Sequence, residues 1–311
     1  MIRIDQISKV YDGVKVVDDV SFTIAKGELC AVVGASGSGK TTLMRMINRL
    51  VEPTSGQVEI NGRDTTEFVA HELRRQIGYV IQGNGLFPHR SVAQNIATVP
   101  QLLGWDRPRI NARIDELLSL FQLDPAHYRD RLPAELSGGQ QQRVGVARAL
   151  AAGPDILLMD EPFGALDPII RNKAQADLLA IQKRFGTTIM LVTHDMNEAI
   201  ALGSMIAVMD QGKLLQVAPP AQLIAKPATA YVEDLIGGSD RAFRLLALDI
   251  VLNHVEPGDA PGDKIDCQAS LREAYGECLW SGRTALPVIQ NGKHIGRITL
   301  ATMARQAARP L

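Results

Sequence analysis

The sequence predicts an α/β fold built on a largely parallel sheet, and three stretches indicate it. Residues 29–42 (LCAVVGASGSGKTT) form an apolar strand that runs into a glycine-rich loop and then opens a helix. The segments ILLMDEP and TIMLVTHD are apolar strands that end in acidic residues or histidine. Apolar strands of this kind are typical of parallel sheets, which bind ligands at the carboxyl ends of their strands. We therefore expect a ligand site at this edge of the sheet.

The glycine-rich loop has the spacing G-x-x-x-x-G-K-[ST], which predicts a phosphate-binding site. Glycines let backbone N–H groups turn inward around phosphate oxygens, and the following helix adds its positive dipole end. Lys40 is expected to neutralise the terminal phosphates and Thr41 to hold Mg²⁺. The alternative, an ordinary glycine-rich turn, is disfavoured by the preceding strand. The expected nucleotide-binding residues here are Gly34, Ala35, Ser36, Gly37, Ser38, Gly39, Lys40, Thr41 and Thr42.

Composition restricts the partners of the chain. Its 311 residues suffice for one large domain and a smaller one. The formal net charge of -1 shows no basic excess that would favour nucleic acid or an anionic membrane surface. The first residues show no secretory pattern, and the apolar run 199–209 is shorter than the roughly twenty residues of a membrane span, so we expect a cytoplasmic chain. Cys30, Cys267 and Cys278 are expected as reduced core thiols, and no structural metal is expected.

The first 82 residues predict strands around the loop. Residues 1–27 alternate polar and apolar positions, which indicates two antiparallel strands joined by a turn at Asp12-Gly13. Tyr11 precedes this turn, and its ring either packs on the sheet or stacks on a nucleobase. Gln82 follows another strand and precedes a glycine run. Its side chain is either a solvated loop group or one that reaches a phosphate-bound Mg²⁺ or water.

Helices are expected between the central strands of the sheet. The region from Ser91 to Leu132 has helical apolar spacing with proline boundaries. In LSGGQQQRVGVARALAAGP, Ser137 and two glycines begin a long helix that ends at Gly153-Pro154. The bare N–H donors of such a helix start can bind an anion, so we expect a second site that grips the same nucleotide.

Polar residues follow the apolar strands of the segments ILLMDEP and TIMLVTHD. Asp160 suits a Mg²⁺ ligand, and Glu161 suits a base for an attacking water. Acidic residues at a strand end are commonly solvated caps, but beside a phosphate loop we favour the catalytic interpretation. His194 emerges at the same expected edge, where it is either a packed surface group or a contact to a terminal phosphate.

Together these residues resemble the ATP-binding cassette (ABC) family of transport ATPases over roughly the first three quarters of the chain. GASGSGKT is similar to the phosphate loop of that family, LSGGQ to its signature, and ILLMDE to its Walker B strand. Ala165-Leu166-Asp167 is similar to its D-loop. Gln82 and His194 match its glutamine and histidine switches, and Tyr11 matches the aromatic residue that stacks on adenine.

The resemblance implies a P-loop NTPase fold in residues 1–236, with a RecA-like mixed sheet, an antiparallel β subdomain and a helical subdomain at about 88–155. It also implies a head-to-tail homodimer, in which the signature of one subunit covers the ATP bound by the other. Glu161, His194 and Gln82 would be catalytic, and Asp167 would couple the two sites. Thr41, Gln82 and Asp160 would hold Mg²⁺. The signature residues are Leu136, Ser137, Gly138, Gly139 and Gln140.

The same resemblance implies an energy subunit of an importer. We expect it to dock on a membrane permease through the helical subdomain at about 88–155, called here the helical insertion, and through the loop after Gln82. It would lie peripherally on the inner face of the cell membrane. The system would include a solute-binding protein. NRLVEPTSGQVEING and MDEPFGALDPIIR resemble the subfamily that imports osmoprotectants such as glycine betaine, choline or proline. The alternatives are an importer of methionine or another amino acid, and a soluble cassette acting on nucleic acid or ribosomes. The sequence shows neither the coiled-coil insertion nor the second cassette usual in the latter class, so no nucleic acid partner is expected.

Residues 237–311 are predicted to form a small α+β tail after the linker Gly237-Gly238-Ser239. A capping-box pattern begins the helix LREAYGECLW, and Asn291-Gly292 joins two strands into a hairpin before a last helix. This order resembles one cystathionine-β-synthase-type (CBS) regulatory motif. Such motifs come in pairs, and residues 241–269 do not supply the other copy. The tail is therefore either a sensor of nucleotide or ionic strength, or an appendage for packing or docking.

Overall fold

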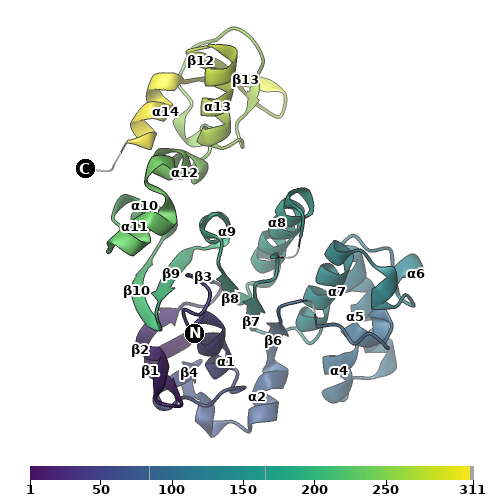
Figure 1. The fold of residues 1–311 in the computed structure, drawn as a ribbon. Helices are drawn as coiled ribbons and strands as arrows, with labels where there is room; N and C mark the ends of the chain where they lie inside the picture. The colour runs from purple at the N-terminus through teal and green to yellow at the C-terminus, as the bar shows by residue number, and fades with distance from the viewer. Residues whose placement is uncertain (84, 165, 309–311) are drawn as a thin grey trace. The chain divides into compact units, whose positions relative to one another are not determined.

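The computed structural model describes residues 1–83, 85–164 and 166–308. The chain divides into two compact units, Met1–Val217 and Ala218–Leu311. The first unit holds a four-stranded sheet and the body of a six-stranded sheet, and the second holds a three-stranded sheet. Helices lie around these sheets (Figure 1). This confirms the predicted α/β fold for the larger part of the chain.

The six-stranded sheet runs in the order β10-β9-β3-β8-β7-β6. The neighbours β9, β3, β8, β7 and β6 pair in parallel. Their carboxyl ends therefore meet at one edge, as expected from the apolar strands. The strands are β3 (Leu29–Val33), β6 (Ile77–Val80), β7 (Ile156–Asp160), β8 (Thr188–Thr193), β9 (Met205–Asp210) and β10 (Lys213–Ala218).

Alternate residues of the central strands pack into two different cores. On β8, Ile189 and Leu191 face one cluster of buried residues, whereas Met190 and Val192 face the other. Successive side chains of a strand point to opposite faces, so continuous apolar strands serve a sheet that is covered on both sides. Cys30 of β3 lies in the second cluster, where burial raises the pKa of its thiol to about 12. All three cysteines are free and buried, as predicted.

The four-stranded sheet covers one of these faces and is antiparallel where β1 pairs with β2 and β4. The predicted turn at Asp12-Gly13 joins its first two strands, and both turn residues have positive φ angles, 47° and 81°. Val17 and Val20 of this sheet pack in the same core as α1. Its strands are β1 (Ile2–Tyr11), β2 (Val14–Ile24), β4 (Ser55–Ile60) and β5 (Arg63–Asp64).

The helices of the first unit include the expected helical insertion. Figure 1 shows α4, α5, α6 and α7 gathered at one side of this unit, away from α1 and α2. The helix that follows the glycine-rich loop ends at Ile47, shortly before Arg49, which adopts a left-handed φ of 53°. The helices are α1 (Lys40–Ile47), α2 (Ala70–Gln76), α3 (Val92–Ile96), α4 (Thr98–Leu102), α5 (Arg107–Leu120), α6 (Pro125–Tyr128), α7 (Gly138–Leu150), α8 (Pro168–Phe185) and α9 (Met196–Leu202), with 3₁₀ turns η1 (Thr65–Glu67) and η2 (Pro133–Glu135).

The second unit has its own core between a small sheet and its helices. Its sheet runs β11-β12-β13, with β11 parallel and β13 antiparallel to β12. The predicted capping box of Ser270 and Glu273 starts α13, and the hairpin turns at Asn291-Gly292. The elements are α10 (Pro220–Ala225), α11 (Ala230–Ile236), η3 (Gly238–Asp240), α12 (Arg241–Ala247), η4 (Val251–His254), β11 (Ile265–Asp266), α13 (Leu271–Ser281), β12 (Ala285–Gln290), β13 (Lys293–Thr299) and α14 (Leu300–Ala307).

The division into units differs from the boundary expected after residue 236. The helices α10 and α11 belong to the second unit, where α10 contacts α12. The expected linker lies inside this unit, since Gly237 follows α11 directly and residues 238–240 form a 3₁₀ turn that leads into α12. Residues 241–269 add α12 and β11 to the same core through Leu246, Val251 and Cys267. Glycine runs indicate flexible linkers only where the neighbouring elements do not pack, and here they do.

Candidate nucleotide and catalytic site

The glycine-rich loop joins β3 to α1 and is packed between two other strands. Gly39, the residue before α1, has a φ of 95°, and a Cβ there would lie 2.4 Å from the carbonyl oxygen of Val16. A Cβ on Gly34 would lie 2.0 Å from the carbonyl oxygen of Met209. Both positions require glycine, because a side chain would collide with backbone. The neighbouring strands therefore fix the path of the loop at the carboxyl edge of the sheet.

Lys40 is buried, and its ammonium group is held by the loop itself. Its Nζ donates to the carbonyl oxygens of Gly34 at 2.8 Å and Ala35 at 2.7 Å, and lies 3.3 Å from Oγ of Ser38. Burial lowers the pKa of Lys40, while the carboxylates of Glu161 and Asp160 raise it. A cation held inside a ring of loop carbonyls at a helix start suits an anionic ligand with phosphate chemistry.

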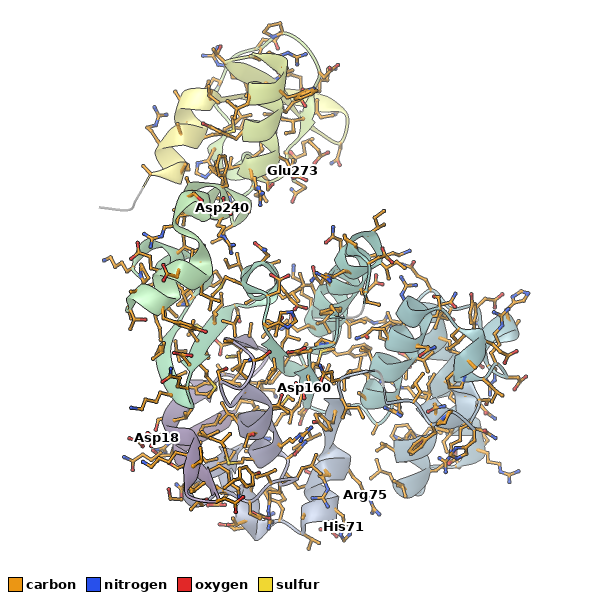
Figure 2. All side chains as sticks on the ribbon, in the orientation of Figure 1. Asp18, His71, Arg75, Asp160, Asp240 and Glu273 are labelled. Atoms are coloured by element: carbon orange, nitrogen blue, oxygen red, sulfur yellow. The ribbon has the colours of Figure 1, made fainter. Side chains whose placement is uncertain are left out.

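Thr41 and Asp160 place two oxygen groups side by side beneath the loop. The hydroxyl of Thr41 donates to Oδ1 of Asp160 at 3.0 Å. Asp160 is only 3% exposed and lies in the interior of the first unit (Figure 2). Burial raises its pKa, and the hydrogen bond from Thr41 opposes this. A hydroxyl next to a buried carboxylate is a donor set that fits Mg²⁺, which prefers oxygen ligands.

Glu161 is the point at which three strand ends converge. It follows β7, has a φ of 45°, and its backbone N–H donates to the carbonyl oxygen of Val192 in β8 at 2.9 Å. Its Oε1 lies 3.3 Å from Nδ1 of His194, which follows β8. Its Oε2 accepts a hydrogen bond from Nε2 of Gln82 at 3.2 Å, beyond the end of β6. The structure thus brings two of the predicted catalytic side chains, Gln82 and His194, to the carboxylate of the third, Glu161.

The signature segment begins α7, as predicted. Ser137 caps this helix by a reciprocal capping box with Gln140, whose Nε2 also donates to the hydroxyl of Tyr128 at 2.9 Å. Leu136 is buried and anchors the segment. A Cβ on Gly139 would lie 2.6 Å from Cγ2 of Ile170, whereas a Cβ on Gly138 would meet no atom within 4 Å. The helix start is therefore pinned on one side by α8 and open on the other.

Asp167 and Tyr11, two other predicted residues, contact groups other than Glu161. Oδ1 of Asp167 accepts from the backbone N–H groups of Ile169 and Ile170, each at 3.1 Å, and so caps α8. Ala165 of the same motif lies outside the described residues. Tyr11 ends β1 with 44% of its surface exposed and the Lys9 ammonium 4.9 Å from its ring. An exposed ring is compatible with base stacking, so both alternatives for Tyr11 remain.

Sequence reasoning missed a buried polar group next to His194. The hydroxyl of Thr193, the last residue of β8, donates to Oε2 of Glu198 in α9, and both residues are buried. On the other side, Arg171 of α8 lies 3.7 Å from the carboxylate of Asp195. The available signal was a polar residue, Thr193, at the end of an apolar strand and another, Glu198, in the helix that follows. Which groups these residues contact depends on how α9 packs against β8.

Comparisons with known proteins bear on the family and the fold of this chain. A family model described as ABC transporter matches residues 17–164. The glycine betaine uptake system ATP-binding protein YehX of Escherichia coli (strain K12) is 46% identical over 290 residues, covering 93% of this chain and 94% of that protein. The osmoprotectant import ATP-binding protein OsmV of Salmonella typhimurium (strain LT2) is 44% identical, covering 95% of this chain and 78% of that protein.

Among solved structures, a dimeric ATP-binding cassette in a post-hydrolysis state, bound to ADP and Pi, is similar with a TM-score of 0.64. Its sequence is 32% identical, and the match covers 71% of this chain and 99% of that one. The fold around the glycine-rich loop is therefore that of a nucleotide-binding cassette.

The packing of the loop predicts unequal costs for two similar substitutions. Gly39→Ala should destabilise the first unit by about 3 kcal/mol, because the left-handed φ and the contact with the Val16 carbonyl both oppose a Cβ. Gly37→Ala is the matched control, since Gly37 has a φ of 80° but open space, and should cost about 1 kcal/mol. Urea unfolding without nucleotide measures both. Equal midpoints for the two variants would contradict the packing argument.

Proposed function

We infer that this chain powers solute uptake by hydrolysing ATP, because it belongs to the glycine betaine and osmoprotectant import family of ABC transporter ATPases. The observation that carries this proposal is the Glu161 carboxylate, held between Gln82 and His194 at the sheet edge where the glycine-rich loop begins. A carboxylate placed there can act on a water next to the terminal phosphate of a bound nucleotide.

The reaction follows from the positions of these groups. Lys40 and the backbone N–H groups of the loop bind the β- and γ-phosphates of ATP. Glu161 orients a water molecule and accepts its proton as the water oxygen attacks the γ-phosphorus. The bond from that phosphorus to the bridging oxygen of ADP breaks, and ADP and phosphate result. Gln82 and His194 fix both carboxylate oxygens, so that little reorganisation is needed at the moment of attack.

We propose that Mg²⁺ binds with the nucleotide at Thr41 and Asp160. The support is the donor set, a hydroxyl 3.0 Å from a buried carboxylate oxygen, to which Gln82, whose amide nitrogen donates to Glu161, would add an amide oxygen. The ion would neutralise charge that develops on the phosphate oxygens. Thr41 and Asp160 would hold this ion next to Glu161, which follows Asp160 in the chain.

We propose that two copies act as a head-to-tail homodimer. Ser137 and the open side of Gly138 present a helix start that an anion can approach, and the hydrogen bonds of Ser137 and Gln140 run to each other and to Tyr128. Ile169, two residues beyond Asp167, is 84% exposed, which is unusual for an apolar side chain of this size. The dimeric state of the similar solved cassette adds support. ATP would then be bound between the loop of one copy and the signature of the other.

We propose that a membrane permease docks in a groove of the first unit, called here the docking groove. No helix of the described residues is both long and apolar enough to cross a membrane. The groove has a volume of about 410 Å³ and is mostly apolar. It lies between the segment after α1, α2, β6 and the helical insertion, where docking was expected from sequence. Its lining includes Leu50, Arg75, Ile81, Phe87, Val99 and Arg148.

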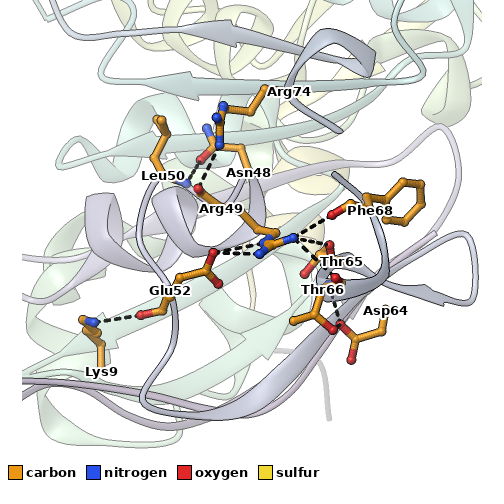
Figure 3. A network of polar contacts seen from close by, with 10 residues as sticks. All are labelled: Lys9, Asn48, Arg49, Leu50, Glu52, Asp64, Thr65, Thr66, Phe68 and Arg74. Carbon is orange, nitrogen blue, oxygen red and sulfur yellow. Dashed lines mark hydrogen bonds and ion pairs between the residues drawn. The ribbon is translucent and has the colours of Figure 1, made fainter. Parts of the chain in front are cut away.

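One wall of the docking groove is fixed to the end of α1 by Arg49 (Figure 3). Its Nη1 donates to the carbonyl oxygens of Thr65 at 3.1 Å and Phe68 at 2.8 Å, and its Nε donates to Glu52 at 3.1 Å. Arg74, which lines the groove, donates to the carbonyl oxygen of Arg49 at 3.0 Å. Since α1 begins at Lys40 and the groove-lining Asn48 directly follows it, this helix connects the nucleotide loop to the groove wall.

We propose an osmoprotectant such as glycine betaine, choline or proline as the solute. The support is the names of the two similar proteins, which concern glycine betaine uptake and osmoprotectant import. We further propose that the second unit is a regulatory tail of CBS type, on the order of its helix, hairpin and helix. The whole protein would act peripherally on the inner face of the cell membrane, supplied by a solute-binding protein.

The assignment of Glu161 predicts the behaviour of Glu161→Gln. Turnover should fall at least about 10²-fold, because the amide cannot accept the proton of water. ATP should still bind, and dimers should accumulate with ATP in size-exclusion chromatography. Glu67→Gln, at an exposed glutamate paired with Arg63, is the control and should retain normal turnover. Normal turnover by Glu161→Gln would refute this role.

The importer assignment predicts a specific uptake defect. Cells that lack this chain should lose most of their glycine betaine uptake at high osmolarity, and the wild-type chain should restore it while Glu161→Gln should not. Radiolabelled betaine, choline, proline and methionine, measured separately, test this. Loss of methionine uptake with normal betaine uptake would instead support the amino-acid importer.

The docking groove predicts a loss of permease binding on Leu50→Asp. Leu50 is 50% exposed and lines the groove, so a buried carboxylate there should weaken the complex roughly tenfold. Leu102→Asp is the matched control, since Leu102 is 56% exposed on α4 outside this lining. The measurement is the amount of permease that copurifies from membranes, with the ATPase rate of the isolated chain as a check. Equal losses for both variants would place the interface elsewhere.

A further inference from the structure

His194 lies between Thr193, which carries a buried hydroxyl, and Asp195, whose backbone N–H donates to that hydroxyl. The hydroxyl of Thr193 donates to Oε2 of Glu198 and accepts from the backbone N–H of Asp195 at 3.0 Å. Thr193 is 2% exposed, and its backbone is paired with Val33 of β3 in the sheet. The backbone on both sides of His194 therefore has a fixed direction, set by the sheet on one side and by α9 on the other.

The buried carboxyl group of Glu198 costs stability at this position. It is 6% exposed, and its Oε1 has no hydrogen-bond partner among the described residues. Burial raises the pKa of its carboxyl group and nearby Asp195 raises it further, whereas the hydrogen bond from Thr193, the charge of Arg171 and the side chain of Gln175 lower it. A buried carboxyl group that is only partly hydrogen-bonded costs stability, whereas an apolar residue of similar size would not. Packing alone does not account for a carboxyl group here.

A second set of contacts extends from the same turn to the neighbouring loop. Asp195 caps α9 by accepting from Asn197 N–H at 2.8 Å, and its Oδ2 lies 3.7 Å from Nη1 of Arg171. Nη2 of Arg171 donates to the carbonyl oxygen of Leu166 at 3.1 Å. Leu166 directly precedes Asp167, the residue proposed to couple the two sites. Arg171 thus connects the turn after β8 to the segment before α8.

We propose that Thr193 and Glu198 are positioning residues, which hold the His194 imidazole against Glu161, and that Arg171 fixes this turn relative to the segment before Asp167. The inference rests on the proposed catalytic site and adds to it the residues that orient His194. The hydrogen bonds of the Thr193 and Glu198 side chains run to each other and to the backbone next to His194, not to the nucleotide-binding loop, so each acts through His194. A displacement of the ring by about 1 Å would suffice to weaken its contact with Glu161.

The test is a pair of variants at Thr193 in two backgrounds. Thr193→Val keeps the shape and removes the hydroxyl, whereas Thr193→Ser keeps the hydroxyl. In the full chain, Thr193→Val should lower kcat about tenfold with KM for ATP nearly unchanged, and Thr193→Ser should stay near wild type. In a His194→Ala background, Thr193→Val should cost less than about twofold more. The same tenfold loss in both backgrounds, or a wild-type kcat for Thr193→Val, would overturn the proposal.

Two further measurements keep the test decisive. If Thr193→Val does not fold, Glu198→Met and Glu198→Gln form the substitute pair, because only glutamine retains an acceptor for the Thr193 hydroxyl. If His194→Ala leaves too little activity to measure, the ring Cε1–H NMR resonance of His194 replaces kcat. That resonance should shift in Thr193→Val and Glu198→Met but not in Thr193→Ser or Glu198→Gln, and an unchanged resonance would overturn the proposal. Wild-type kcat in His194→Ala alone would instead refute the proposed catalytic role of His194.

Discussion

The parallel pairing of four strands is the constraint on which the rest of the site depends. In the order β3-β8-β7-β6, Val33 lies opposite Thr193, Asp160 opposite Val192, and Val80 opposite Met159. The residues that follow these strand ends are therefore delivered at nearly the same level of one edge. A shift of one residue in any pair would turn the side chains of that strand to the other face. The register is secured because both faces of these strands pack into cores.

Burial at this edge of the sheet shifts the pKa values of charged groups that an anionic ligand would meet. Burial lowers the pKa of Lys40 and raises that of Asp160, while the attraction between the two groups opposes both effects. The ammonium group of Lys40 already has its hydrogen bonds to the carbonyl oxygens of Gly34 and Ala35. Phosphate oxygens can replace those partners without a further loss of water from the lysine. Much of the desolvation cost is thus met during folding, which is what preorganisation of a binding site means.

Local sequence predicted the elements of the site well, because each motif carries its own backbone geometry. The glycine positions around Lys40, the helix start at Ser137 and the strand end at Asp160 all follow from residue type and spacing. The sequence could also place polar residues at the ends of parallel strands. It could not show that Glu161 contacts Gln82 and His194 at once, since that depends on the order of strands in the sheet.

Two features depended on how elements pack and were missed for that reason. Thr193 and Glu198 are only five residues apart in the sequence, but their hydrogen bond depends on the contact of α9 with the end of β8, which residue type alone does not show. The division of the chain near residue 217 depends on α10 contacting α12, and the glycine run that suggested a linker lies between helices of one compact unit. Local signals of flexibility and capping are reliable for backbone conformation, but not for what an element packs against.

The contacts within one chain also explain how two sites of a dimer would be linked. From His194, the path runs through Asp195 and Arg171 to the carbonyl oxygen of Leu166. The next residue, Asp167, caps α8, and Ile170 of that first turn lies against Gly139 at the start of α7. In the proposed head-to-tail dimer, His194 serves the ATP bound by its own chain, and Gly139 serves the ATP of the other. A movement of the His194 turn would therefore reach the signature of the opposite site through a short set of packed groups, without crossing the dimer interface.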